Sequence, residues 1–299
     1  MYKFSFLVAM VFLAAMSNLV SATEKNLPWQ DNVKGKYIFS KWDGGKVSVN
    51  FTVPPTANAD TPILLVVPGA KRNADNYRDQ WHQLALKHNF IVLAIGCSLK
   101  TCQSEYEYNM GGIFDHTGRK QGENRQFFSV PELVFNDFVE AFHSQQKTFA
   151  LYGHSAGGGF VHLYMLTRPN APVSRAVSAN AAFFTFPDEQ ITFPFGLKSS
   201  TFNSKNVEDW LQTPLIFMLA DQDIGPRTKP LSNSQRAREQ GLSVFSRGLS
   251  FYSAAINTAA QKNIKPTWKL EIVQDVGHNS TKIVPHAFKY LFPQLIKEL

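Results

Sequence analysis

Short apolar runs recur along the chain and alternate with segments of helical periodicity. The clearest run, PILLVV at residues 62–67, is apolar on both faces, which is typical of a central parallel strand. We expect further strands at residues 90–95, 148–152, 173–179, 214–219 and 267–273. We expect helices after residue 75, after residue 157, and at residues 132–143 and 280–291, and a mostly helical segment at residues 232–262. This alternation predicts an α/β fold with a mostly parallel sheet flanked by helices.

The pattern near the N-terminus is different. Residues 36–40 and 46–53 are strand-like and are joined by Asp43-Gly44-Gly45, which is a hairpin turn signal. Apolar and polar residues alternate in the second of these strands, so one of its faces should be wetter than the other. We therefore predict an antiparallel hairpin at the start of the fold.

Two segments lack periodicity. Residues 96–130 are rich in Gly, Tyr, Asn and Phe, and a loop of this length in a compact domain is usually functional or disordered. Residues 181–212 are rich in Phe and Ser and could form a cap or a wall of a cleft. The aromatic residues of both segments could line an apolar cleft, or they could pack in the core and the cap.

Composition and charge narrow the class of protein. The chain has 299 residues, of which 44% are hydrophobic. This is enough for one large core or two smaller ones, and we expect a single domain over residues 23–299. The net charge is +7, but the cationic residues are scattered, apart from small groups such as Arg236 and Arg238. Because no basic stripe with interleaved aromatic residues is present, we expect no nucleic-acid partner.

The first residues have the pattern of an export signal. Lys3 is followed by an apolar run at residues 4–15 and by the small residues Val20-Ser21-Ala22. The run is shorter than the roughly 20 residues that a membrane span needs. We predict cleavage after Ala22, a secreted or periplasmic protein, and no stable membrane anchor, with an uncleaved anchor as the alternative.

Cys97 and Cys102 are the two cysteines of the chain. In an exported protein such a pair predicts a local disulfide bond. A metal site is the alternative, but zinc sites usually have four ligands and this pair supplies only two. We therefore expect no metal.

The segment GHSAGG lies between a predicted strand and a predicted helix. Gly-x-Ser-x-Gly in this context is typical of a nucleophile elbow, which exposes its serine on a sharp turn. Gly153 and Gly157 leave room where strand and helix nearly touch, and Gly158 and Gly159 should let the helix lie close to neighbouring strands. We predict that Ser155 is a catalytic nucleophile, the alternative being a glycine-rich turn without chemistry.

A serine nucleophile needs a general base, and the base needs a partner that fixes its tautomer. In the α/β-hydrolase arrangement the acid and then the histidine follow the serine, each on a loop after a strand. His278 has this order and position, and Gly277 beside it should permit a tight approach. Asp223 is the favoured acid and Asp221 the alternative. His154, next to the nucleophile, should point elsewhere and either pack or support the site.

Two backbone N–H groups are expected to hold the oxyanion. One belongs to Ala156, the residue after the nucleophile. The other belongs to Ala70 or Lys71, in the turn that follows residues 62–67. The chemistry requires no metal and no organic cofactor.

Several motifs together resemble secreted bacterial α/β-hydrolases of the polyhydroxyalkanoate-depolymerase-like and feruloyl-esterase-like group. The motifs are PGAKRNADNYRDQW, YNMGGIFD, GHSAGG, ADQDIGPR and VGHNS. The resemblance covers roughly residues 60–291. It implies the α/β-hydrolase fold, with Ser155, Asp223 and His278 as the triad and the segment after residues 62–67 as the oxyanion loop. Pro68-Gly69 stands where members of this group commonly have His-Gly.

We therefore expect a secreted serine hydrolase that cleaves a small or oligomeric carboxylic ester through an acyl-enzyme. A serine peptidase is the second hypothesis, because the same triad cleaves amides. The third hypothesis is a hydrolase fold that has lost catalysis and serves only for binding.

Overall fold

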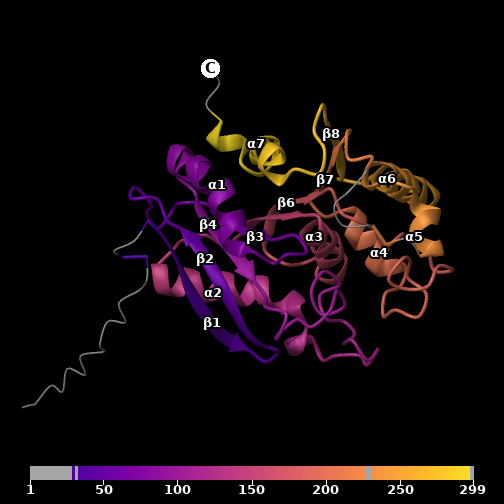
Figure 1. Cartoon of the computed structure of the whole chain (residues 1–299), viewed down its shortest axis with the longest axis horizontal. Coiled ribbons are helices and arrows are strands. Elements are labelled where there is room, and N and C mark those ends of the chain that lie inside the picture. The colour runs from indigo at the N-terminus through magenta and orange to yellow at the C-terminus, as the bar shows by residue number, and fades with distance from the viewer. Residues whose placement is uncertain (1–28, 31–32, 226–230, 233, 297–299) are drawn as a thin grey trace, which may run out of the picture.

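The computed structural model describes residues 29–30, 33–225, 231–232 and 234–296 (Figure 1). The predicted export signal and its cleavage site after Ala22 lie outside the described residues. None of the helices in these described ranges combines the length and the apolar character of a membrane span.

An eight-stranded sheet runs through the centre of the molecule in the order β1-β2-β4-β3-β5-β6-β7-β8 (Figure 1). β2 pairs antiparallel with both β1 and β4, and all other neighbours are parallel. This confirms the predicted mostly parallel sheet with an N-terminal hairpin. The strands are β1 (Lys34–Trp42), β2 (Gly45–Thr52), β3 (Ile63–Val67), β4 (Ile91–Gly96), β5 (Phe149–His154), β6 (Val173–Ala179), β7 (Leu215–Ala220) and β8 (Lys269–Val273).

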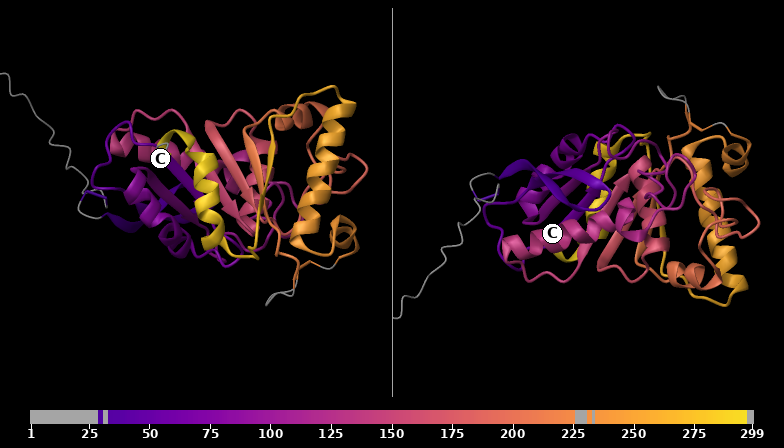
Figure 2. Two further views of the ribbon diagram at one scale, coloured as in Figure 1. Left: turned by 90° about the horizontal axis from the view of Figure 1, so that it is seen from above. Right: turned by 90° about the horizontal axis from the view of Figure 1, so that it is seen from below.

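Helices cover both faces of the sheet, as Figure 2 shows for α7 in the view from above and α2 in the view from below. α1 and α7 pack on one face, while α2, α3, α4 and α6 supply the core on the other. The helices are α1 (Ala74–His88), α2 (Val130–Phe142), α3 (Ala156–Thr167), α4 (Ser204–Leu211), α5 (Gln235–Gln240), α6 (Val244–Gln261) and α7 (Ser280–Leu291).

The central strands are apolar on both faces because each one supplies both cores. In β3, Ile63, Leu65 and Val67 enter the core beneath α2, α3 and α6. Leu64 and Val66 enter the core beneath α1 and α7. This alternation explains why the strand pattern is a continuous apolar run rather than a period of two.

The segment at residues 181–212 contains a helix that the sequence pattern did not reveal. α4 has eight residues and begins at a capping box between Asn203 and Asn206. Its buried side chains are Val207, Trp210 and Leu211. A helix this short has too few turns to show a clear period.

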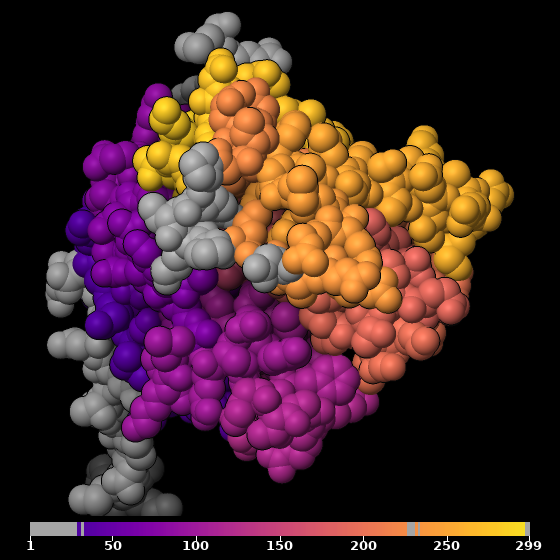
Figure 3. Space-filling view, turned by 45° about the vertical axis from the view of Figure 1, so that its right-hand side comes forward, coloured from indigo at the N-terminus to yellow at the C-terminus, as the bar shows by residue number. Residues whose placement is uncertain are grey.

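The segment between β4 and α2 has no helix or strand before a 3-10 turn at Glu123–Arg125, as the sequence predicts for residues 96–130. It is nevertheless packed, since Tyr108, Met110 and Ile113 are buried. In the space-filling view it belongs to the purple and magenta lower part of the surface (Figure 3). The carboxyl ends of β3, β5, β7 and β8 share one edge of the sheet, where ligands of open α/β sheets bind.

Candidate active site

Ser155 lies at the sharp turn between β5 and α3. Its backbone has φ 58° and ψ −118°, a combination that residues other than glycine rarely adopt and that indicates strain. Hydrogen bonds hold the turn, from Ser155 N to Ala179 O at 2.9 Å and from Gly159 N to Ser155 O at 3.0 Å. The backbone therefore has the form of the predicted elbow.

The elbow depends on backbone contacts that only glycine allows. A Cβ atom at Gly153 would lie 2.1 Å from Gly157 O. A Cβ atom at Gly157 would lie 2.0 Å from Val67 O. These distances confirm the close approach of strand and helix, and they show that the elbow also presses against the end of β3.

Asp223 and His278 come together from loops that follow the neighbouring strands β7 and β8. His278 Nδ1 lies 2.6 Å from Asp223 Oδ2. The Asp223 side chain is 2% exposed and the His278 side chain is 25% exposed. A buried carboxylate on Nδ1 fixes the proton there and leaves Nε2 as the basic nitrogen of an accessible imidazole.

The alternative acid, Asp221, lies in the same loop but makes different contacts. Its backbone N donates to Val273 O at 3.1 Å, and its Oδ1 has no hydrogen-bond partner among the described residues. Gln222 N donates to Val276 O at 2.9 Å. These backbone bonds hold the Asp223 loop against the loop that carries His278.

Gly277 is not tightly packed. A Cβ atom there would meet Gln222 O at 3.5 Å, which is ordinary van der Waals contact. The expectation that Gly277 permits a tight approach is therefore wrong, because the two loops are joined by backbone hydrogen bonds elsewhere.

His278 lies beside the elbow. Its ring centroid is 4.6 Å from that of His154, the residue directly before Ser155. Within the described residues no hydrogen bond joins His278 to Ser155 Oγ. Such contacts are often long in enzymes without substrate and tighten in the reacting complex.

A buried tyrosine on α1 connects three loops of the site. Tyr77 Oη lies 3.0 Å from His154 Nδ1. Burial raises the pKa of Tyr77 to about 12, while hydrogen bonds from the Gly69 backbone and the Ser280 side chain oppose the rise. Gly69 belongs to the turn after β3, and Ser280 begins α7 just after His278. No role for Tyr77 follows from the sequence pattern, although a hydroxyl near the start of α1, soon after the oxyanion loop, is a signal for one.

The turn after β3 lies next to the nucleophile position. A Cβ atom at Gly69 would be 3.4 Å from Ser155 Cβ. Ala70 and Lys71 are exposed in this turn, and Ala156 is the first residue of α3. The backbone groups expected to hold an oxyanion thus belong to the two segments that adjoin Ser155.

Cys97 and Cys102 form a disulfide bond, with a distance of 2.05 Å between the sulfur atoms. This confirms the predicted bond. Among the described residues, no group of three or more His, Cys, Asp and Glu side chains is placed to hold a metal ion.

Comparison with solved structures identifies related hydrolases. Poly(aspartic acid) hydrolase-1 from Sphingomonas sp. KT-1 is 35% identical with a TM-score of 0.84, over 87% of this chain and 98% of that protein. LpqC, a poly(3-hydroxybutyrate) depolymerase from Bordetella parapertussis, is 25% identical with a TM-score of 0.82, over 89% and 91%. No family model matches the chain, and no curated protein matches it.

More distant structures share the fold alone. An S-formylglutathione hydrolase from Agrobacterium tumefaciens is 14% identical with a TM-score of 0.59, over 88% of this chain and 95% of that protein. The poly(aspartic acid) hydrolase is far more similar, with 35% identity and a TM-score of 0.84 over nearly its whole length. The chain therefore belongs to the bacterial α/β-hydrolases of the depolymerase and esterase type, and it is a hydrolase.

Proposed function

We propose that the protein is an exported serine hydrolase that cleaves carboxylic esters with Ser155, His278 and Asp223 as its catalytic triad. The observation that carries the proposal is the contact of 2.6 Å between His278 Nδ1 and Asp223 Oδ2, beside the strained turn of Ser155. A base oriented in this way is what a serine nucleophile requires. The disulfide bond supports export, because disulfides persist mainly in oxidising compartments.

In the proposed mechanism, Ser155 Oγ attacks the carbonyl carbon of the substrate while His278 Nε2 takes its proton. The amides of Ala156 and of Ala70 or Lys71 stabilise the tetrahedral oxyanion. His278 then gives the proton to the oxygen of the departing alcohol, and the bond between this oxygen and the carbonyl carbon breaks. Water attacks the acyl-enzyme with the help of His278, which releases the carboxylic acid and restores Ser155.

Asp223 has two tasks in this mechanism. It holds His278 in the tautomer that keeps Nε2 free, and it stabilises the imidazolium that forms during each proton transfer. Its burial supports these tasks, since a carboxylate shielded from water acts more strongly on its neighbour.

A second candidate is the cleavage of amide bonds in an anionic polymer. It is favoured by the 35% identity to a poly(aspartic acid) hydrolase. The net charge of +7 also fits an acidic substrate.

Assays of the wild type and of Ser155→Ala test the proposal. The substrates are p-nitrophenyl butyrate, oligomers of 3-hydroxybutyrate and poly(aspartic acid). We expect the wild type to hydrolyse the esters and Ser155→Ala to lose kcat by up to about 10⁶-fold.

The other outcomes of this assay are equally informative. Hydrolysis of poly(aspartic acid) without ester hydrolysis would establish the second candidate. Unchanged ester hydrolysis by Ser155→Ala would show that another group is the nucleophile.

A further inference from the structure

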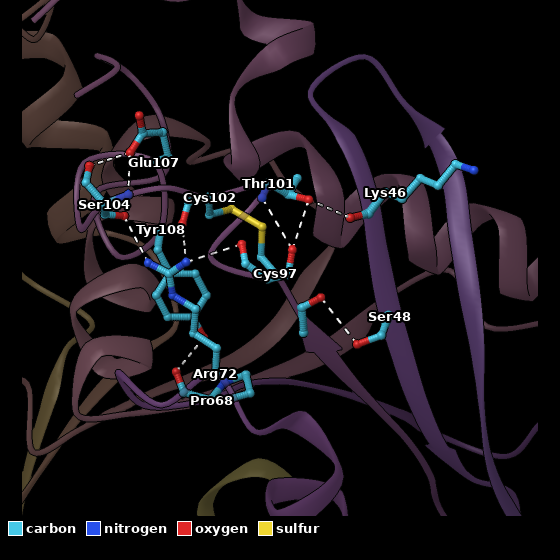
Figure 4. Close-up of a disulfide and its surroundings, with 12 residues drawn as sticks. Lys46, Ser48, Pro68, Arg72, Cys97, Thr101, Cys102, Ser104, Glu107 and Tyr108 are labelled. Carbon is cyan, nitrogen blue, oxygen red and sulfur yellow. Dashed lines mark hydrogen bonds between the residues drawn. A yellow bond between two sulfur atoms is a disulfide. The ribbon is translucent and has the colours of Figure 1, made fainter. Parts of the chain in front are cut away.

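The segment that carries the proposed oxyanion amides is anchored at both of its ends. At one end, the hydroxyl of Tyr108 donates to Pro68 O at 2.7 Å. At the other end, the guanidinium of Arg72 donates to the carbonyl oxygens of Ser98 at 3.4 Å, of Cys102, and of Ser104 at 3.1 Å (Figure 4). Gly69, Ala70 and Lys71 lie between these anchors.

The two anchors also contact each other. Figure 4 shows the guanidinium of Arg72 against the ring of Tyr108. Arg72 Cζ lies 4.6 Å from the centroid of this ring, which is a cation–π distance. Tyr108 is 1% exposed, so its ring is a fixed part of the core. Pro68, Tyr108 and Arg72 therefore form a closed bracket around the turn.

The turn inside the bracket has a conformation that needs support. Arg72 N donates to Gly69 O at 2.8 Å, which closes the turn. Arg72 itself has φ 58°, a left-handed conformation that is unfavourable for a residue with a long side chain. The contacts of its guanidinium hold the residue in this state.

We propose that Arg72 and Tyr108 are positioning residues that fix the oxyanion loop by bracketing residues 69–71. This inference rests on the proposed function, since it concerns the amides that would receive the oxyanion. Neither side chain touches the substrate in this role. They act by keeping the Ala70 and Lys71 amides at the distance from Ser155 at which the donors work.

The segment at residues 97–107, whose carbonyl groups accept from Arg72, is itself held by internal bonds. The disulfide bond joins Cys97 to Cys102, and Cys102 N donates to Ser98 O at 2.8 Å. Ser104 N donates to Glu107 Oε2 at 2.8 Å. The three carbonyl groups that receive Arg72 thus belong to a segment closed by one covalent bond and by local hydrogen bonds. Reduction of the disulfide should therefore loosen the bracket.

Two variants remove one anchor each. Tyr108→Phe keeps the ring and its contact with Arg72 but loses the hydrogen bond to Pro68. Arg72→Lys keeps the charge, but a single ammonium group cannot span three carbonyl groups as a planar guanidinium does. We expect kcat per titrated active site to fall by about tenfold to a hundredfold, with KM little changed. A misplaced N–H donor stabilises the oxyanion of the transition state less well but hardly affects the binding of the substrate.

Binding of phenylboronic acid separates this effect from a loss of folded protein. Its tetrahedral adduct with the serine mimics the transition state, so affinity for it should fall by a similar factor in both variants. Reduction of the wild-type disulfide with dithiothreitol should produce the same pattern, and reoxidation should reverse it.

Arg78→Lys is the matched control. Arg78 is a second buried arginine, which donates to Gly35 O and Phe51 O at 3.1 Å each. These carbonyl groups lie on the N-terminal hairpin rather than on the disulfide segment. We expect Arg78→Lys to lower the melting temperature but to leave kcat per active site and boronate affinity unchanged.

Three results decide the matter. Wild-type kcat per active site and wild-type boronate affinity in Tyr108→Phe and Arg72→Lys would overturn the bracket and leave the triad standing. The bracket would also be overturned if the two variants lost activity only in proportion to the amount of folded protein lost, as expected for Arg78→Lys. Full activity of Ser155→Ala would instead remove the proposed function on which the bracket rests.

Discussion

At the scale of single residues, two carboxylates in one loop have very different surroundings. Asp223 is 2% exposed and its Oδ2 contacts His278, whereas Asp221 is only partly buried. The sequence favoured Asp223 but left both open, because residues so close in a loop can each reach the same histidine. The direction of each side chain is set by how the loop is bonded to residues 273–276, which no local pattern reveals.

Substitution of these two residues distinguishes their roles. We expect Asp223→Asn to lower kcat for p-nitrophenyl butyrate by about 10⁴-fold, because an amide no longer holds His278 in the productive tautomer. Asp221→Asn is the matched control and should stay within about tenfold of the wild type. Equal losses in the two variants would contradict the assignment of Asp223.

At the scale of elements, α3 is shaped by glycines of unequal importance. A Cβ atom at Gly158 would lie 2.5 Å from Ala179 O, a backbone atom that cannot easily move. At Gly159 it would meet only the Asn109 side chain, at 3.8 Å. The expectation that both glycines permit close packing is confirmed for Gly158 and is wrong for Gly159.

This difference gives a prediction for stability. Gly158→Ala should lower the free energy of unfolding by about 1–3 kcal/mol, the usual cost of overpacking. Gly159→Ala should raise it by up to about 1 kcal/mol, because alanine favours the helix over glycine. Urea unfolding of both variants measures the two changes. Destabilisation of similar size at both positions would contradict the conclusion that Gly158 is tightly packed and Gly159 is not.

The elements that the sequence predicts well are those with strong patterns. The strand at residues 173–179 matches β6, and the helix at residues 280–291 matches α7. Residues 232–262, predicted to be mostly helical, contain α5 and α6, and the break between these helices lies at Gly241, which has φ 147°. Such a break depends on one backbone conformation, which apolar periodicity does not report.

At the scale of the whole molecule, a buried histidine ties α3 to the segment after β6. His162 Nδ1 lies 3.3 Å from Gly158 O, and Thr185 N donates to His162 Nε2 at 3.1 Å. Burial lowers the pKa of His162 from 6.5 to about 4, although hydrogen bonds to the backbone of α3 oppose the change. The ring is therefore neutral in the folded protein at neutral pH.

Stability should consequently depend on pH. Between pH 6.5 and about 4 the unfolded chain binds a proton at His162 that the folded protein does not bind, so acidification through this window favours unfolding. The total effect is about 3 kcal/mol at pH 4, and it is absent above pH 6.5. Urea unfolding at several pH values measures the free energy of unfolding as a function of pH. Between pH 6.5 and about 4 this free energy should fall less steeply for His162→Gln than for the wild type, and equal pH dependence of the two proteins would contradict the prediction.

The assembled site shows what a sequence can and cannot reveal about function. The order of Ser155, Asp223 and His278 could be read from motifs, because each follows a strand in a fixed arrangement. The links through Tyr77, Tyr108 and Arg72 could not, because they join loops that are distant in sequence. Their hydrogen bonds depend on the packing of the finished sheet and its helices.

The most direct measurement is to identify the residue that reacts with diisopropyl fluorophosphate, which bonds to an activated serine oxygen and releases fluoride. We predict one equivalent of label on the peptide that contains Ser155, and a much slower reaction in His278→Ala because the base is missing. Labelling of a different residue, or an unlabelled Ser155 in protein that still hydrolyses its substrate, would contradict the proposed triad.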